Sequence, residues 1–335
     1  MKSLHFDVNV APNSLQQMPK LAKSADQLGF DALWTSETQH DPFMPLALAA
    51  EHTDRVQLGT AIAVALARSP GTVAYTSWDL AAATGGRFIL GLGSQVRAHI
   101  ERRFGLDWPE NPTTKMREFV GALRAFWRCW QGEADFNFQG DHYRLRLMTP
   151  FFNPGPIDHP DIPIFLAGVN RGSLRLAGEV AEGLHGHPLH TPRYLREVVR
   201  PALGEGAKDA GRDPDQIQLS VTAFVISTAE EEAEVRRQIA FYASTPNYRP
   251  VMALHGWGEV ADRLGSLVRQ GDWKSMPALI TPDMLENFAV RGQGAELGAA
   301  LRERYQGLAD RVNIYRPLRV DEDKRWQPIL EGFRN

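Results

Sequence analysis

The segment 78–93 constrains the fold of this chain more than any other. It begins with an Ala- and Leu-rich stretch that favours helix. Gly85-Gly86 follow as a left-handed helix stop. Residues 88–92 form a short apolar run, as expected of an inner strand. This run leads into Gly93 and a loop whose small residues let a ligand approach the backbone. The segment therefore predicts a helix, a buried strand and an accessible loop in succession.

Seven further apolar segments alternate with helical patterns, which indicates parallel βαβ units. Eight strands in series favour an α/β fold of the closed (β/α)8 type, a TIM barrel, over an open sheet. A doubly wound open sheet is the alternative, but no dinucleotide glycine fingerprint follows the first strand. The expected strands are 4–10, 32–35, 56–63, 88–92, 162–168, 183–188, 217–225 and 311–315. The expected helices include 18–28, 46–54, 122–130, 174–182 and 326–333.

The chain has 335 residues, whereas such a barrel needs about 250. We therefore expect a single domain, 1–335, with insertions before strands five and eight. The first, about 133–161, contains a predicted hairpin that turns near Gly140-Asp141 and then a Pro-rich stretch. The second is about 244–291. Insertions of this size between barrel elements often cover the active-site mouth.

Composition excludes several classes of protein. The formal net charge is -3 with both signs mixed, so a basic stripe for nucleic acid is missing from the sequence. The single cysteine, Cys129, excludes an internal disulfide and a Cys-based metal cluster. The sequence opens on a strand pattern without a signal peptide, and no apolar run approaches the roughly 20 residues needed to span a membrane. We expect a cytoplasmic protein that does not bind membranes.

Catalytic groups in such barrels gather at the carboxyl ends of the strands. Glu37 and His40, after the second strand, are the candidate acid/base pair, because a carboxylate and an imidazole can tune each other's protonation near neutral pH. The alternative is a solvated loop in which Asp41 caps the next helix. His185, His187 and His190 lie close together in sequence, but a third ligand on one face is not evident, so we expect no metal site.

The turn 168–173 leads from the fifth strand into a helix. A helix N-terminus presents free amides and positive dipole to an anion, the glycines permit close approach, and Arg171 could add charge. An ordinary capped turn is the alternative.

The order of these motifs resembles the bacterial luciferase-like superfamily of flavin and deazaflavin oxidoreductases. The similar segments are 29–34, 58–62, 68–70, 85–93 and 177–183. Within the superfamily the chain is most similar to the branch that uses coenzyme F420, a deazaflavin, through 40–43, 90–96 and 102–105.

The resemblance implies a (β/α)8 barrel, a homodimer and a cofactor ring over the carboxyl mouth. It also implies a cis peptide at Ala61–Ile62, which would bulge against that ring, and a phosphate loop at 168–172. The cofactor-binding residues implied are Ala61, Ile62, Ala63, Gly93, Ser94, Gln95, Gly168, Val169, Asn170, Arg171, Gly172 and His187.

One departure from the branch concerns the proton donor. Many relatives have an Asp-His pair directly after strand two, where this chain has Glu37 and Thr38, and the imidazole is displaced to His40. The resemblance implies an oxidoreductase that moves a hydride between coenzyme F420 and a small organic substrate, with Glu37 and His40 managing protons. An FMN-dependent monooxygenase that uses O₂ is the first alternative, and a non-catalytic flavin-binding protein is the second.

Overall fold

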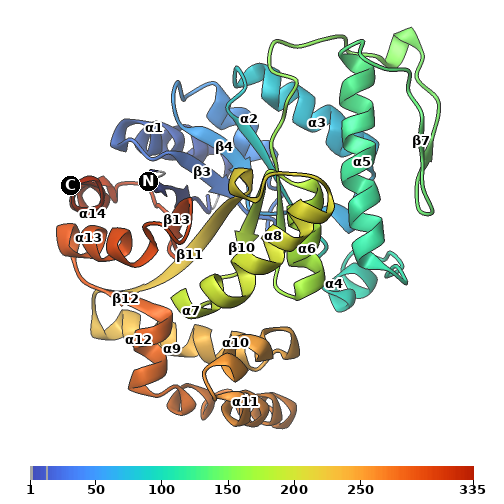
Figure 1. Ribbon diagram of the computed structural model, residues 1–335. Helices are drawn as coiled ribbons and strands as arrows, with labels where there is room; N and C mark the ends of the chain where they lie inside the picture. Colours follow the sequence, from blue (N-terminus) through green and yellow to red (C-terminus); the bar gives the residue numbers. More distant parts are fainter. Residues whose placement is uncertain (1–2, 13) are drawn as a thin grey trace.

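The computed structural model describes residues 3–12 and 14–335. A ring of parallel strands forms its centre, and helices surround it (Figure 1). Along the ring the order is β1-β13-β11-β10-β9-β6-β4-β3-β2. This is the predicted TIM barrel. The strands are β1 (His5–Phe6), β2 (Val8–Asn9), β3 (Ala32–Thr35), β4 (Gln57–Thr60), β5 (Ala63–Val64), β6 (Phe88–Gly93), β9 (Ile164–Gly168), β10 (Gly183–Gly186), β11 (Gln218–Ile226) and β13 (Arg311–Ile314).

The ring closes through the first barrel strand, which is divided at Asp7. β1 pairs with β13 and β2 pairs with β3, so the chain changes neighbours at this residue. The continuous strand expected over 4–10 is therefore two short strands. The change of partner joins the last strand of the sequence to the second, which brings the two ends of the sheet together.

The third barrel strand is also divided. The Ala61–Ile62 peptide bond is cis, as the family resemblance implied, and it separates β4 from β5. At the end of β4 the Thr60 hydroxyl donates to the Gly91 carbonyl of β6 (2.6 Å) and accepts from the Gly91 amide (2.9 Å). A Cβ atom on Gly91 would lie 1.7 Å from the Thr60 carbonyl oxygen, so this approach requires glycine.

The barrel helices follow their strands as expected, with shifts at their ends. Gly29 (φ 84°) ends the first helix, and both Gly85 and Gly86 have positive φ after the third, which confirms the glycine stops. The helices are α1 (Met18–Leu28), α2 (Met44–Ala50), α3 (Pro70–Ala83), α4 (Arg97–Arg102), α5 (Pro112–Trp130), α6 (Arg171–Val180), α7 (Pro192–Tyr194), α8 (Arg200–Asp209), α9 (Ala229–Ala243), α13 (Gly294–Tyr305) and α14 (Asp323–Arg334). None of the helices in the described ranges is both long and apolar enough to cross a membrane.

The first insertion packs on the outside of the barrel. Its hairpin is confirmed: β7 (Phe138–Gln139) pairs antiparallel with β8 (Arg144–Leu145) beside α5 (Figure 1). The Glu118 carboxylate of α5 accepts amide hydrogen bonds from the hairpin turn. The following stretch accepts hydrogen bonds at its carbonyls from Tyr75 and Trp78 of α3. These contacts lie on α3 and α5, so the expectation that this segment covers the mouth is wrong.

The second insertion brings its first residues, 245–247, to a cleft at the mouth. It contains η6 (Pro246–Tyr248), α10 (Arg249–Leu254), α11 (Gly258–Gln270), α12 (Pro282–Phe288) and β12 (Ala289–Arg291), a strand that the sequence analysis did not predict. β12 pairs with the end of β11. The helices lie beside α9, on the side of the molecule away from the hairpin (Figure 1).

A buried ion pair lies inside the barrel. The Arg311 guanidinium donates to both oxygens of Asp7 (2.8 and 3.0 Å), and the indole of Trp34 donates to the same carboxylate (3.0 Å). The two charged side chains are 3% and 0% exposed. Burial raises the pKa of the Asp7 carboxyl, and the guanidinium beside it opposes that shift. His185 packs edge-on against Trp34, and burial lowers its pKa to about 3, so the imidazole is neutral.

Candidate active site

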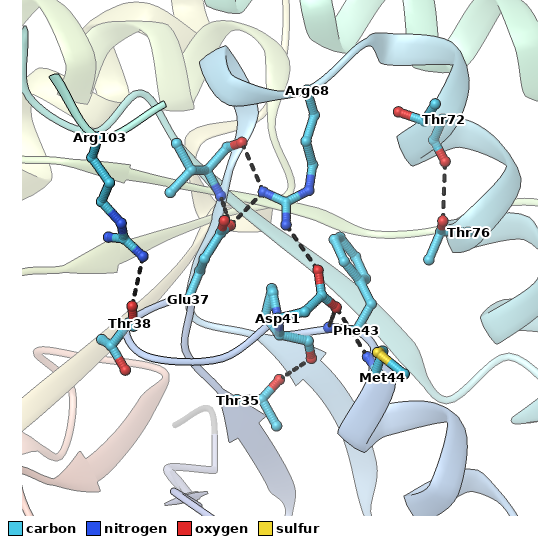
Figure 2. Close-up of polar contacts among 12 residues, drawn as sticks. Thr35, Glu37, Thr38, Asp41, Phe43, Met44, Arg68, Thr72, Thr76 and Arg103 are labelled. Carbon is cyan, nitrogen blue, oxygen red and sulfur yellow. Dashed lines mark hydrogen bonds and ion pairs between the residues drawn. The ribbon is translucent and has the colours of Figure 1, made fainter. Parts of the chain in front are cut away.

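Glu37 is held in an ion-pair network at the end of β3 (Figure 2). Its carboxylate accepts from the Val64 amide (2.7 Å) and pairs with the Arg68 guanidinium. Arg68 also pairs with Asp41 (3.0 Å), whose other oxygen accepts from the amides of Phe43 and Met44. The network ties the loop after β3 to the segment after β5. Asp41 thus accepts from amides at the start of α2, but the N-cap of this helix is Phe43, so the alternative in which Asp41 is the N-cap places the cap two residues too early.

The structure does not bring the predicted acid/base pair together. The Glu37 side chain is 7% exposed and paired with Arg68, whereas His40 is exposed. No contact joins the two side chains within the described ranges, so the predicted pair is not formed. His40 instead lines a cleft of about 370 Å³ between the ends of β2, β3 and β13. Glu37 therefore positions the loop, and the imidazole of His40 reaches the cleft.

The cis peptide lies between this loop and β6. The Ser36 hydroxyl donates to the Ala61 carbonyl (2.8 Å), and the Glu37 amide donates to the Ile62 carbonyl (3.2 Å). Ala61 and Ile62 are half-buried at the mouth, so both have surface to offer a ligand. Ala63 is fully buried and has none. A Cβ on Gly93 would meet the Ile62 side chain at 2.8 Å, so glycine there lets Ile62 lie close to β6.

A second cleft, of about 530 Å³, brings together the loop after β6 and the start of α6. Predicted residues from both segments line it, and residues 245–247 of the second insertion close one side. Its hydrogen-bonding side chains among the described residues are Ser94, Gln95, Arg97, Trp108, Thr113, Asn170, Ser173, Thr245 and Asn247. Arg97 pairs with Glu101 of α4 (3.0 Å). Gln95 has a φ of 62°, the left-handed region that non-glycine residues rarely occupy, and such outliers cluster at ligand sites.

The turn 168–173 begins α6 with a side-chain cap, and its arginine, Arg171, forms an ion pair with another helix. The Asn170 carboxamide oxygen accepts from the Ser173 amide (2.9 Å), and the Ser173 hydroxyl accepts from the Val169 amide (3.1 Å). Arg171 pairs with Glu205 of α8 (2.6 Å), so its charge is compensated there, contrary to the expectation that it would serve an anion. The first amides of α6, including that of Gly172, lack carbonyl partners within the helix, as at any helix start.

We expect Asn170→Ala to lower the free energy of unfolding by about 1 kcal/mol, because the cap of α6 is lost. The same change should weaken binding of a phosphate-bearing ligand in the cleft. Asn170→Ser is the matched control, since a serine hydroxyl also caps helices. Urea unfolding and equilibrium dialysis of the two variants check both effects, and equal stability of Asn170→Ala and the unaltered protein would contradict the capping role.

His187 lies under an aromatic cluster that the sequence analysis missed. It stacks on Tyr248 (ring centroids 4.2 Å apart) and meets Tyr242 edge-on (4.5 Å). Burial lowers the pKa of His187 to about 3, and its Nδ1 accepts from the Leu189 amide, so the proton is on Nε2. The hydroxyls of Tyr242 and Tyr315 are 2.5 Å apart. Tyr315 could have been found, because it continues the inward-facing alternation of β13; the others come from the second insertion and α9.

His190, the other histidine after β10, is structural. His190 bonds the His187 carbonyl through Nδ1 (2.9 Å) and the Tyr305 hydroxyl through Nε2 (3.1 Å). Both ring nitrogens are therefore occupied. Across residues 3–12 and 14–335, no three His, Cys, Asp or Glu side chains are grouped as metal ligands would be.

A family model described as luciferase-like monooxygenase matches residues 2–311. The chain belongs to this family. An uncharacterized protein of Mycobacterium tuberculosis is 46% identical over 308 residues, which are 90% of each chain. A second M. tuberculosis relative, provisionally assigned as a coenzyme F420-dependent oxidoreductase, is 31% identical over 296 residues, which cover 82% of this chain and 83% of the relative.

Among solved structures, the coenzyme F420-dependent tetrahydromethanopterin reductase from Methanopyrus kandleri superposes with a TM-score of 0.80. The match covers 98% of this chain and 97% of the reductase at 23% sequence identity. At that identity the likeness concerns the fold, and it agrees with the barrel described above.

Proposed function

We propose that this luciferase-like protein is an oxidoreductase that transfers a hydride between coenzyme F420 and a small organic substrate. The observation that carries the proposal is the cleft that joins the loop after β6 to the start of α6 at the barrel mouth. A relative that is 31% identical carries a provisional assignment to the same cofactor, which supports the choice of deazaflavin.

The residues of this cleft fit a phosphate-bearing cofactor. Ser94, Asn170 and Ser173 bring neutral donors to one wall, and the α6 N-terminus adds helix dipole and free amides. Ala61 and Ile62 provide a half-buried apolar surface beside this wall, on which a planar ring can lie. A bound deazaflavin would supply the hydride-carrying ring.

Side chains of the protein would position the ligands and exchange protons with them. The Glu37–Arg68–Asp41 network fixes the loop that carries His40, and the exposed imidazole of His40 is free to exchange a proton with a ligand in its cleft. His187 is neutral and locked by Tyr248 and the Leu189 amide, so it would contact a ligand as a donor through Nε2.

We expect the protein to bind coenzyme F420 with a dissociation constant at least about tenfold below that for FMN. Fluorescence titration of the purified protein with each cofactor measures both constants. Tight FMN binding without measurable F420 binding would reverse the ranking.

An FMN-dependent monooxygenase is the second candidate, because the family description names that activity. A deazaflavin has carbon at the reactive ring position and does not readily activate oxygen. Consumption of O₂ with reduced FMN and a substrate would therefore favour the monooxygenase, and hydride exchange under anaerobic conditions would favour the deazaflavin enzyme. A protein that binds either cofactor without turnover of any acceptor would be a flavin carrier.

A further inference from the structure

The cleft that His40 lines is separate from the one at the start of α6. It lies between the ends of β2, β3 and β13, whereas the α6 cleft lies at β6 and β9, across the ring of strands. Most of the hydrogen-bonding side chains that line it are neutral: Asn9, Thr35, Ser36, Thr38, Gln39, Gln238 and Tyr315. The other polar side chains among its described lining residues are His40, Asp41 and Arg316. A volume of about 370 Å³ suits a small molecule.

The one carboxylate among the described residues that line the cleft is already engaged. One oxygen of Asp41 accepts from Arg68 (3.0 Å), and the other accepts from the amides of Phe43 and Met44 (2.8 and 3.1 Å). Arg68 is shared with Glu37, so the three side chains together carry one net negative charge (Figure 2). This side of the cleft offers no attraction to an anion.

In the described part of the lining there is one arginine, and its charge is compensated as well. Arg316 pairs with Glu231 (2.5 Å) and Glu322 (3.5 Å), and Arg325 also pairs with Glu231. Two guanidinium groups and two carboxylates therefore cancel. Arg103 donates to the Thr38 carbonyl (2.6 Å) and is not among the lining residues (Figure 2).

We propose that the substrate bound in this cleft is a small uncharged polar molecule, such as an alcohol, a carbonyl compound or an amide, and that carboxylated or phosphorylated compounds are rejected. The inference rests on the proposed function and narrows its substrate class. An anion placed here would lose its hydration without gaining an uncompensated arginine among the described lining residues, which is costly, whereas a neutral polar group finds several donors and acceptors.

Paired fragments test the preference. Primary amides from acetamide to benzamide are each compared with the carboxylate of the same skeleton by ligand-observed NMR. The variant Gln238→Trp places a large side chain from α9 in the cleft. NMR binding signals that are lost in this variant are assigned to ligands bound in the cleft. We expect amides to bind with dissociation constants at least about tenfold below those of their carboxylates. Carboxylates that bind as tightly as amides, or the lack of any amide signal sensitive to Gln238→Trp, would overturn the proposal.

Glu231→Gln tests the cause of the preference. The glutamine oxygen can keep the bond from the Ser227 amide (2.8 Å), but Arg316 loses one of its compensating charges. Carboxylate affinity should rise about tenfold while amide affinity stays the same. Glu230→Gln, which removes the adjacent exposed charge on α9, is the matched control and should change neither. An unchanged carboxylate affinity in Glu231→Gln would contradict the charge argument.

Titration of the same preparations with coenzyme F420 keeps the two proposals distinguishable. Loss of the amide preference in a protein that binds F420 overturns the substrate class alone. An intact amide preference in a protein that does not bind F420 overturns the proposed cofactor alone.

Discussion

Arg311→Met should lower the free energy of unfolding by about 3–5 kcal/mol, because it leaves the Asp7 carboxylate buried without its guanidinium partner. The indole of Trp34 is the one remaining donor to that carboxylate among the described contacts. Urea unfolding followed by tryptophan fluorescence and circular dichroism measures the loss.

Two further variants test whether the loss comes from an unpaired charge. The double variant Asp7→Leu with Arg311→Met should recover most of the stability, since replacing both partners of a buried pair by apolar groups is often near neutral. Lys20→Met breaks an exposed pair with Asp321 and should change stability by less than about 1 kcal/mol. A loss in Arg311→Met no larger than that in Lys20→Met would show that the pair does not stabilise the barrel.

His40→Ala should lower turnover by at least about 10²-fold at saturating cofactor, because positioned proton transfer contributes about 10²–10⁴-fold. His40 lies outside the α6 cleft, so the dissociation constant of coenzyme F420 should change by only a few fold. Steady-state rates under anaerobic conditions and fluorescence titration check the two expectations. His142→Ala, at the hairpin turn on α5, is the control and should leave both values unchanged. Turnover in His40→Ala equal to that of the control would remove His40 as the proton donor.

Glu37→Gln separates positioning from proton transfer. Because Glu37 is bonded to Arg68, we expect Glu37→Gln and Arg68→Met to lower turnover by similar factors. The double variant should be no slower than the slower single variant, as expected for residues of one network. Losses that multiply in the double variant would indicate that Glu37 acts on the reacting atoms independently of Arg68.

The sequence alone determined the barrel and its connections. Local signals carry that information: apolar runs such as 88–92 identify strands, and glycines such as Gly29 and Gly85-Gly86 end helices through their own backbone freedom. The hairpin near Gly140-Asp141 was equally local. The cis peptide at Ala61–Ile62 was predicted from the family resemblance and not from the local sequence pattern. The residues that surround this bond in space are distant from it in the sequence.

Only the tertiary structure decided which side chains meet at the mouth. Glu37 and His40 are three positions apart in the sequence, yet Glu37 forms its ion pair with Arg68. Arg171 likewise forms an ion pair with Glu205 on α8. The compensation of Arg316 joins α9 to α14 across the end of β13. Side-chain pairing at strand ends depends on how loops from different βα units converge in space. The sequence does not contain the distances between side chains of different loops. The residues at the mouth could therefore be predicted from it, but their ion-pair partners could not.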